Sequence, residues 1–93
     1  MRGVTGFGDR DLPSCGTTTR NGGSLDVFVN GKMVSRQGDF NKLHDNCNDS
    51  THVTSITTGS STVLINGKGC GRVGDAIGCG TVAEGSLNVL AGD

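Results

Sequence analysis

The chain has few of the residues from which small proteins build a stable core. It contains no Trp and no Tyr, only three Phe, and 32% hydrophobic residues over 93 positions. A domain of this size buries little apolar surface, so it usually gains stability from disulfide bonds, a structural metal or a partner chain. The four Cys and two His of the sequence supply material for the first two of these.

Long hydrophobic runs and clustered charges are also missing. No segment approaches the roughly 20 apolar residues of a membrane-spanning helix, and residues 1–4 are not followed by the apolar core of a secretory signal. The net charge is -1, and Lys and Arg are scattered singly rather than forming the basic stripe that nucleic-acid binding requires. We therefore expect one domain over residues 1–93, without a signal peptide and without a nucleic-acid partner.

Glycine, by contrast, is abundant and marks an internal repeat. The 17 glycines follow no three-residue period, which excludes a collagen-like chain. Residues 23–32 and 59–68 both run from Gly-Ser through a hydrophobic stretch to Asn-Gly-Lys, and residues 85–90 are a truncated third copy. A Gly-Asp pair recurs along the chain, at residues 8–9, 38–39, 74–75 and 92–93. The sequence therefore predicts three related units.

Within a unit, the pattern predicts two short strands joined by a tight turn. Val27-Phe28-Val29 and Val63-Leu64-Ile65 are β-branched, aliphatic and aromatic runs typical of strands. Each run is followed by Asn-Gly, which favours a type I′ hairpin turn because both residues tolerate a positive φ. No segment repeats apolar residues with helical spacing, and glycine at this density disfavours helices. We expect an all-β fold.

The loops between the units carry the residues best suited to bind a metal. Cys15, His52 and Cys79 stand six to eight residues before the Gly-Ser of the following unit. Three units around one axis would direct these side chains toward one point, and His44, in the longest loop, would complete a set of four. Thiolate and imidazole ligands in this number suit a tetrahedral, structural Zn²⁺ site.

The remaining cysteines leave alternatives open. Cys47 lies in the same loop as His44 and competes with it for the fourth ligand position. Cys70 stands where the preceding unit has Val34, which predicts a packing role and an unreactive thiol. Disulfide bonds are another use of four cysteines, but neither a secretory signal nor paired spacing accompanies them here.

The sequence shows no nucleophile, base and orienting acid in a context typical of an enzyme, so we expect a structural protein. Asp9, Asp39 and Asp75 each follow a glycine, which favours a turn-stabilising role because Asp side chains bond nearby backbone amides. Arg36 and Arg72 precede two of these aspartates by three residues. We interpret both arginines as contacts between units.

Gly-Ser, a hydrophobic strand, Asn-Gly-Lys, four residues ending in Arg, and then Gly-Asp resemble the PAAR repeat. The resemblance covers nearly the whole chain and is most specific over residues 23–39 and 59–75. It departs in the tetrapeptide that names the family, which here reads Met33-Val34-Ser35-Arg36 and Gly69-Cys70-Gly71-Arg72. Only the arginine of that tetrapeptide is retained.

The resemblance implies both a fold and a function. PAAR-repeat proteins sit on the trimeric spike of type VI secretion systems and contractile phage tails, as a small pseudo-threefold cone of short β-hairpins with a metal near its vertex. Carried over to this chain, the metal ligands are Cys15, His44, His52 and Cys79. Zinc is the implied metal, and iron is the alternative because two of the four ligands are thiolates.

The resemblance further implies that one copy of the chain caps a spike trimer, sharpens it, and meets the target-cell membrane transiently. The base would form around residues 27–29, 63–65 and 87–89, and the ligand-bearing loops would face away from it. The protein would reside at the tail tip of a phage virion, or in the bacterial cytoplasm until it is injected. A separate effector is a further partner that the sequence leaves open. The alternative is a small disulfide- or metal-stabilised binding module without a role in injection.

Overall fold

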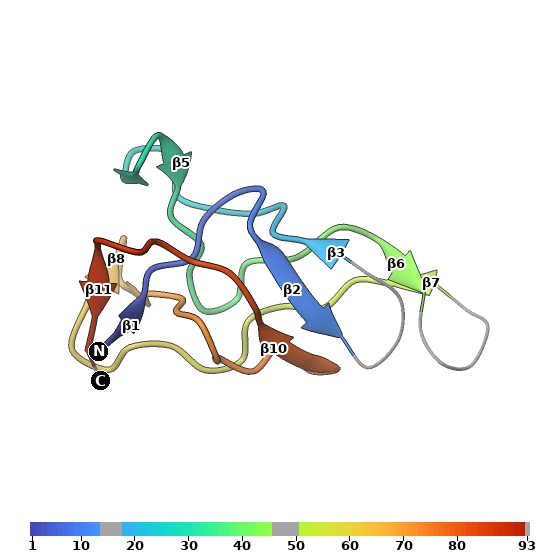
Figure 1. Ribbon diagram of the computed structural model, residues 1–93. Helices are drawn as coiled ribbons and strands as arrows, with labels where there is room; N and C mark the ends of the chain where they lie inside the picture. The colour runs from blue at the N-terminus through green and yellow to red at the C-terminus, as the bar shows by residue number, and fades with distance from the viewer. Residues whose placement is uncertain (14–17, 46–50, 93) are drawn as a thin grey trace.

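The protein is built from short β-strands (Figure 1). The computed structural model describes residues 1–13, 18–45 and 51–92. The strands are β1 (Arg2–Gly3), β2 (Arg10–Pro13), β3 (Thr18–Thr19), β4 (Phe28–Val29), β5 (Lys32–Met33), β6 (His44–Asp45), β7 (Thr51–His52), β8 (Leu64–Ile65), β9 (Lys68–Gly69), β10 (Gly80–Val82) and β11 (Leu90–Ala91). These described residues contain no helix, and so none that could span a membrane. The predicted all-β class is confirmed.

Two antiparallel hairpins repeat the same turn. β4 pairs with β5 and β8 pairs with β9, in registers that leave Asn-Gly as the two-residue connection. Asn30 and Gly31 have φ values of 53° and 79°, and Asn66 and Gly67 repeat them with 55° and 80°. Two successive positive φ values are those of a type I′ turn, whose twist matches the twist of the paired strands. The predicted strand-turn-strand unit is therefore confirmed.

The third hairpin joins the two ends of the chain. β11 pairs with β1, with Leu90 opposite Gly3 and Ala91 opposite Arg2, so the first and the last strand of the chain lie side by side (Figure 1). The copy that the sequence presents as truncated at residues 85–90 is thus completed by the first residues of the chain. Its Gly-Asp pair is residues 8–9, which follow β1 as residues 38–39 follow β5.

Three backbone segments, one from each unit, close a ring at the centre of the molecule. The amide of Thr5 donates to the carbonyl of Gly71 at 3.1 Å, that of Ser35 to Thr5 at 3.0 Å, and that of Gly71 to Ser35 at 2.9 Å. Each residue donates to one neighbour and accepts from the other, as expected around a threefold axis. All three residues are buried, and a Cβ added to Gly71 would lie 2.8 Å from the Cδ1 of Ile56. Glycine therefore lets the ring close beside the core.

A layer of small apolar side chains lies on the hairpin side of this ring. Val4, Val34 and Cys70 immediately precede the three ring residues, and they pack together with Ala91. Cys70 is 1% exposed, and its burial raises the pKa of its thiol. A thiol with a raised pKa carries little reactive thiolate. The packing role predicted for Cys70 is confirmed.

The layer on the other side of the ring is apolar in one unit, mixed in the second, which places buried Asn41 beside Ile56, and charged in the third. Ile56, Ile77 and Val82 form a buried apolar cluster. At equivalent positions of the remaining unit, Asp11 and Arg20 form an ion pair with Oδ2 and Nε 3.3 Å apart and both side chains fully buried. Burial raises the pKa of Asp11 and lowers that of Arg20, since each loses the water that solvates its charge.

Each unit also contains a turn closed by its aspartate. The Oδ2 atoms of Asp9, Asp39 and Asp75 accept a bond from the backbone amide three residues earlier, at 2.9, 2.7 and 2.7 Å. The preceding glycines have φ values of 89°, 95° and 90°, as the third position of a type II turn requires. Arg36 and Arg72 bond the aspartate of their own unit and also an oxygen of a neighbouring unit. The predicted turn and contact roles are both observed.

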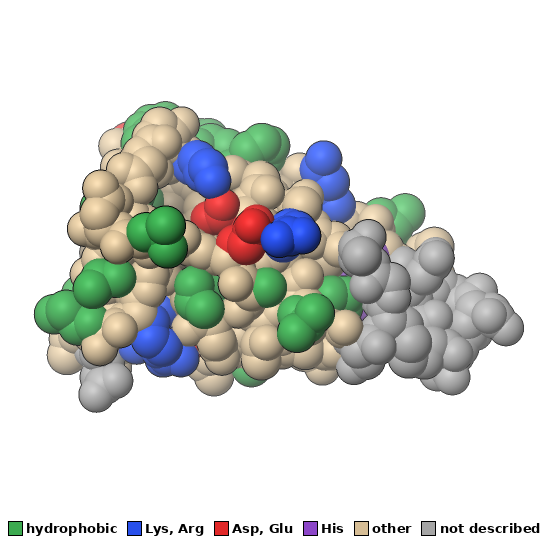
Figure 2. All heavy atoms as spheres, viewed as in Figure 1, with side chains coloured by type: hydrophobic (Ala, Val, Ile, Leu, Met, Phe, Trp, Pro, Cys, Tyr) green, Lys and Arg blue, Asp and Glu red, His purple; other side chains and the backbone are tan. Residues whose placement is uncertain are grey.

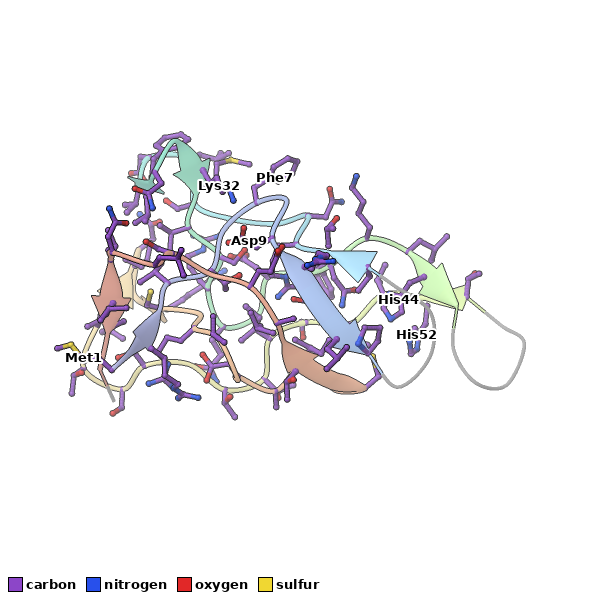
Figure 3. All side chains as sticks on the ribbon, viewed as in Figure 1. Met1, Phe7, Asp9, Lys32, His44 and His52 are labelled. Carbon is purple, nitrogen blue, oxygen red and sulfur yellow. The ribbon has the colours of Figure 1, made fainter. Side chains whose placement is uncertain are left out.

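The molecule is elongated, with extents of 36 × 23 × 22 Å. The three hairpins lie at one end and β6 and β7 at the other, with β2, β3 and β10 between them (Figure 1). Hydrophobic side chains gather at the hairpin end, next to acidic and basic side chains on the flank (Figure 2). Asp9 and Lys32 lie on this flank, with Oδ1 and Nζ 2.6 Å apart, far from the two histidines (Figure 3).

Candidate metal centre

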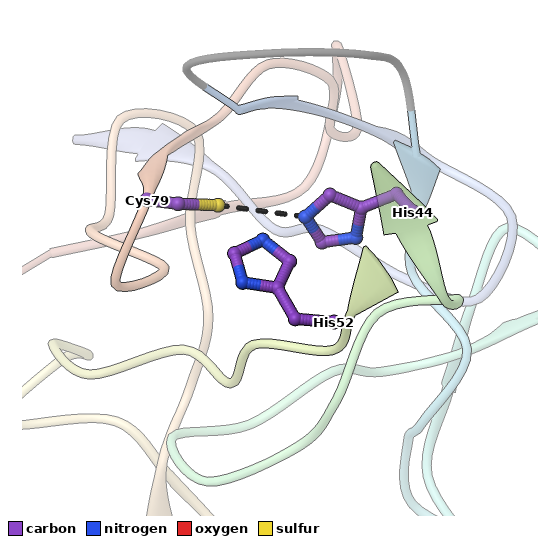
Figure 4. A group of neighbouring side chains, drawn as sticks. All are labelled: His44, His52 and Cys79. Atoms are coloured by element: carbon purple, nitrogen blue, oxygen red, sulfur yellow. Dashed lines mark hydrogen bonds between the residues drawn. The ribbon is translucent and has the colours of Figure 1, made fainter. Parts of the chain in front are cut away.

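The structure brings three of the four predicted ligands together. His44, His52 and Cys79 each present a ligand atom, and these atoms all lie within 4.8 Å of one another (Figure 4). The fourth predicted ligand, Cys15, and its competitor Cys47 lie outside the described residues. The role of all four predicted residues as metal ligands stays a prediction.

Local strand pairing places the two histidines beside each other. His44 in β6 lies directly opposite His52 in β7. Opposite residues of an antiparallel pair project from the same face with their Cβ atoms close together. The two imidazole rings meet edge to face, with centroids 4.5 Å apart and an interplanar angle of 65°. One hairpin therefore supplies two nitrogen ligands.

Cys79 reaches the histidines from another unit and is held between two glycines. Gly78 has a φ of 90°, a conformation that side chains disfavour. Gly80 begins β10, which pairs with β2 so closely that a Cβ at this position would overlap the carbonyl oxygen of Leu12. The two glycines thus permit a close turn that leaves the Sγ of Cys79 3.5 Å from the Nε2 of His44.

The tautomer of His44 is fixed by the backbone. Its Nδ1 lies 2.8 Å from the carbonyl oxygen of Lys42. A carbonyl accepts but does not donate, so Nδ1 carries a hydrogen, and in the neutral ring Nε2 presents its lone pair toward Cys79. Ligand histidines in metal sites are usually oriented by such a bond from their second nitrogen. His44 is 4% exposed, so this arrangement is shielded from water.

His52 supplies the observation that tests whether a metal fits. Its Nε2 is buried, and no described residue hydrogen-bonds it. A buried nitrogen without a partner costs about 1–3 kcal/mol, which coordination to a metal would offset. The 3.5 Å between Cys79 Sγ and His44 Nε2 also agrees with the separation of about 3.5 Å between nitrogen and sulfur ligands of tetrahedral zinc. The described residues therefore fit a bound metal ion.

Sequence reasoning missed two residues next to this group. The hydroxyl oxygen of Thr54 lies 3.8 Å from the Sγ of Cys79, and the side-chain amide of Asn41 donates to that hydroxyl at 2.7 Å. The signal available in the sequence was strand periodicity, because Thr54 stands two residues after His52 and residues so spaced share a face.

One comparison with known proteins identifies the family. The profile of the PAAR motif matches residues 10–85, which is most of the chain and includes the three described ligand candidates. No curated protein matches the sequence. The matched segment also contains both complete hairpins and the ion pairs of Arg36 and Arg72 with their aspartates. The chain belongs to the PAAR motif family.

Proposed function

We propose that this protein is a structural tip that caps and sharpens the trimeric β-helical spike of a contractile injection machine, either a phage tail or a type VI secretion system. The PAAR motif is associated with spike tips in both kinds of machine. The observation that carries the proposal is the ring of Thr5, Ser35 and Gly71, through which one chain arranges three hairpin units around an axis. A single copy can therefore meet a threefold partner.

The hairpin end has the features that such a partner would use. Phe28, Leu64 and Leu90 stand at equivalent positions of β4, β8 and β11, and they are 55%, 59% and 49% exposed. Exposed apolar patches on soluble proteins commonly mark interaction sites. A trimeric β-helix ends in three sets of unpaired strand groups, which a threefold array of hairpins can cover at one copy per trimer.

The opposite end is proposed to be stiffened by a metal. His44 and His52 would bind it from the β6–β7 hairpin and Cys79 from the loop before β10, with Cys15 as the proposed fourth ligand. Bound there, a metal would cross-link two segments that are far apart in the sequence. Zinc suits this mixture of nitrogen and sulfur donors, with iron as the alternative. A rigid vertex is what a tip needs during its transient contact with a target membrane.

The remaining features of the proposal follow from this role. The protein acts structurally rather than as an enzyme, forms one domain over residues 1–93, and has no nucleic-acid partner. It resides at the tail tip of a virion, or in the bacterial cytoplasm until it is injected. A separate effector carried on the loops is compatible with this arrangement.

Co-expression with the trimeric spike protein of the same machine tests the proposal. We expect the two proteins to co-purify at one copy of this chain per spike trimer, as measured by native mass spectrometry. Phe28→Asp and Leu64→Asp place a charge at the hairpin end, so each variant should reduce co-purification. Leu43→Asp is the matched control, because Leu43 is 66% exposed next to β6 at the opposite end, and binding should be retained.

Metal content and circular dichroism of the same samples show whether a variant is folded. A folded, metal-loaded Phe28→Asp variant that still binds the spike at the native ratio would show that the hairpin end is not the base. Absence of any complex with the unchanged chain would remove the spike as the partner.

A further inference from the structure

The sulfur of Cys79 has a hydroxyl neighbour supplied by the second unit. Thr54 Oγ1 lies 3.8 Å from Cys79 Sγ, within hydrogen-bonding distance for sulfur. Thr54 also lies beside Gly78, the residue before Cys79, because a Cβ added to Gly78 would lie 3.6 Å from both the Cβ and the Cγ2 of Thr54. Thr54 thus contacts the loop on which the cysteine is carried.

The direction of the hydroxyl proton follows from the bonds of Asn41. Thr54 donates its backbone amide to Asn41 Oδ1 at 2.8 Å, and Asn41 Nδ2 donates to Thr54 Oγ1 at 2.7 Å. If the oxygen and nitrogen of the Asn41 amide were exchanged, its NH₂ group would face the backbone N–H of Thr54, and two donors cannot bond each other. The orientation of the Asn41 amide is therefore fixed. Because the hydroxyl oxygen already accepts from Asn41, its proton is left to donate to Cys79. A metal-bound thiolate has no proton and can only accept.

Asn41 is itself held in place by the buried ion pair. It is 1% exposed, and its Nδ2 also donates to Asp11 Oδ2 at 3.2 Å. Asp11 in turn lies 3.3 Å from the Nε of Arg20. A continuous buried polar chain therefore runs from Arg20 through Asp11, Asn41 and Thr54 to the sulfur, and its bonds leave little freedom for the Thr54 hydroxyl.

We propose that Thr54 is a positioning residue for Cys79, donating to its sulfur a hydrogen bond whose direction Asn41 sets. The inference rests on the proposed metal centre and deepens it. The bond fixes where the sulfur points and withdraws electron density from the thiolate. Hydrogen bonds to charged groups are stronger than neutral ones, and loss of a partner outside the ligands commonly weakens metal affinity 10- to 100-fold.

Cobalt(II) chloride, added alone to the metal-free protein, reports directly on the sulfur. Thr54→Val keeps the shape of the side chain but removes the donor, and Thr54→Ser keeps the donor. We expect Thr54→Val to weaken Co²⁺ affinity about 10-fold in competition with a chelating indicator. The sulfur-to-cobalt charge-transfer band should move to longer wavelength, because an unbonded thiolate gives up an electron more easily. Thr54→Ser should restore both values.

Thr57→Val is the matched control, because the Thr57 hydroxyl bonds the carbonyl of Ala76 at 3.2 Å in an exposed position. It should leave the band and the affinity unchanged. A purely structural role for Thr54 would change stability without moving the band. Thr54→Val with the affinity and band of the unchanged protein would therefore overturn the inference.

A second measurement covers the case in which Thr54→Val does not fold. In the unchanged protein loaded with NMR-active cadmium, the Thr54 hydroxyl proton should exchange slowly with water and show scalar coupling to the metal through the sulfur. Its absence would overturn the inference. Failure of the unchanged protein to bind Co²⁺ would refute the metal centre together with this inference, whereas failure to bind a spike would affect only the proposed partner.

Discussion

At the scale of single residues, the three repeated aspartates share a turn but differ in what surrounds the cation that each one bonds. Asp75 bonds two guanidinium nitrogens of Arg72, a residue that is 5% exposed. Asp9 bonds the Nζ of Lys32, whose side chain is 49% exposed. Removing a carboxylate from a buried cation costs far more than removing it from one that water can solvate. Aspartates at equivalent positions of the repeat therefore contribute differently to the free energy of unfolding.

We predict that Asp75→Ala destabilises the protein by about 3 kcal/mol or more, because the buried Arg72 loses its carboxylate partner. Asp9→Ala should cost only about 1–2 kcal/mol, mainly from the backbone amide of Gly6 that loses its acceptor. Chemical denaturation of the two variants under identical conditions measures the difference. Equal losses would mean that the shared turn, rather than burial of the cation, sets the cost.

At the scale of secondary-structure elements, no strand of the described chain is long enough to be stable alone. β6 and β7 each contain two residues and pair only with each other. They lie at the end of the molecule opposite the three hairpins β4–β5, β8–β9 and β1–β11. An isolated two-stranded hairpin is marginal in water. The contact of His44 Nε2 with Cys79 Sγ links this hairpin to the segment that leads into β10, and Thr54, which follows β7, reaches the same sulfur.

We predict that removal of the metal loosens this end first. A structural metal contributes its binding free energy to folding. A loss of 1 kcal/mol in the free energy of unfolding lowers the melting temperature of a domain of this size by about 4–8 °C. A strong chelator should lower the melting temperature by about 10 °C or more. Hydrogen exchange should show protection lost first in β7 and β10, while the amides of Thr5, Ser35 and Gly71 stay protected.

Elemental analysis of the purified protein provides the control for the chelation experiment. Either a preparation without stoichiometric metal or a melting temperature that the chelator leaves unchanged would contradict the assignment of the site. Uniform loss of protection across the ring and the vertex would instead show that the metal stabilises the whole molecule rather than one end.

At the scale of the whole molecule, the sequence predicted features that depend on neighbouring residues or on the repeat. It missed contacts between segments that are far apart in the chain. The Asn-Gly turns, the aspartate turns and the packing role of Cys70 were predictable because each depends on a few neighbouring residues or on the repeat. The pairing of β1 with β11 was not, since no local motif marks strands at opposite ends of a chain. The burial of Asp11 and Arg20 was missed because charged residues are rarely fully buried.

The unpredicted pairing of β1 with β11 shows how one chain closes a threefold array. Val29 lies opposite Lys32 and Ile65 opposite Lys68, each pair joined by Asn-Gly, and Ala91 lies opposite Arg2 in the same register. The chain termini therefore occupy the place that a type I′ turn fills in the other two units. The two turns and the gap between the chain ends are then equivalent positions at which the chain can be opened.

We predict that a circular permutant folds when Ala91 and Arg2 are joined by Asn-Gly and the chain is opened between Asn66 and Gly67. The new connection supplies the turn that the register of Ala91 and Arg2 requires, and the opened turn only repeats the arrangement of the present termini. The melting temperature should stay within a few degrees of the parent value, and the metal content should be unchanged. The control has the same join but is opened between Ser35 and Arg36, which cuts the chain next to the central ring and should prevent folding. A permutant opened at Asn66 that fails to fold would show that the three hairpins are not interchangeable, and that closure of the array depends on the connection between β8 and β9.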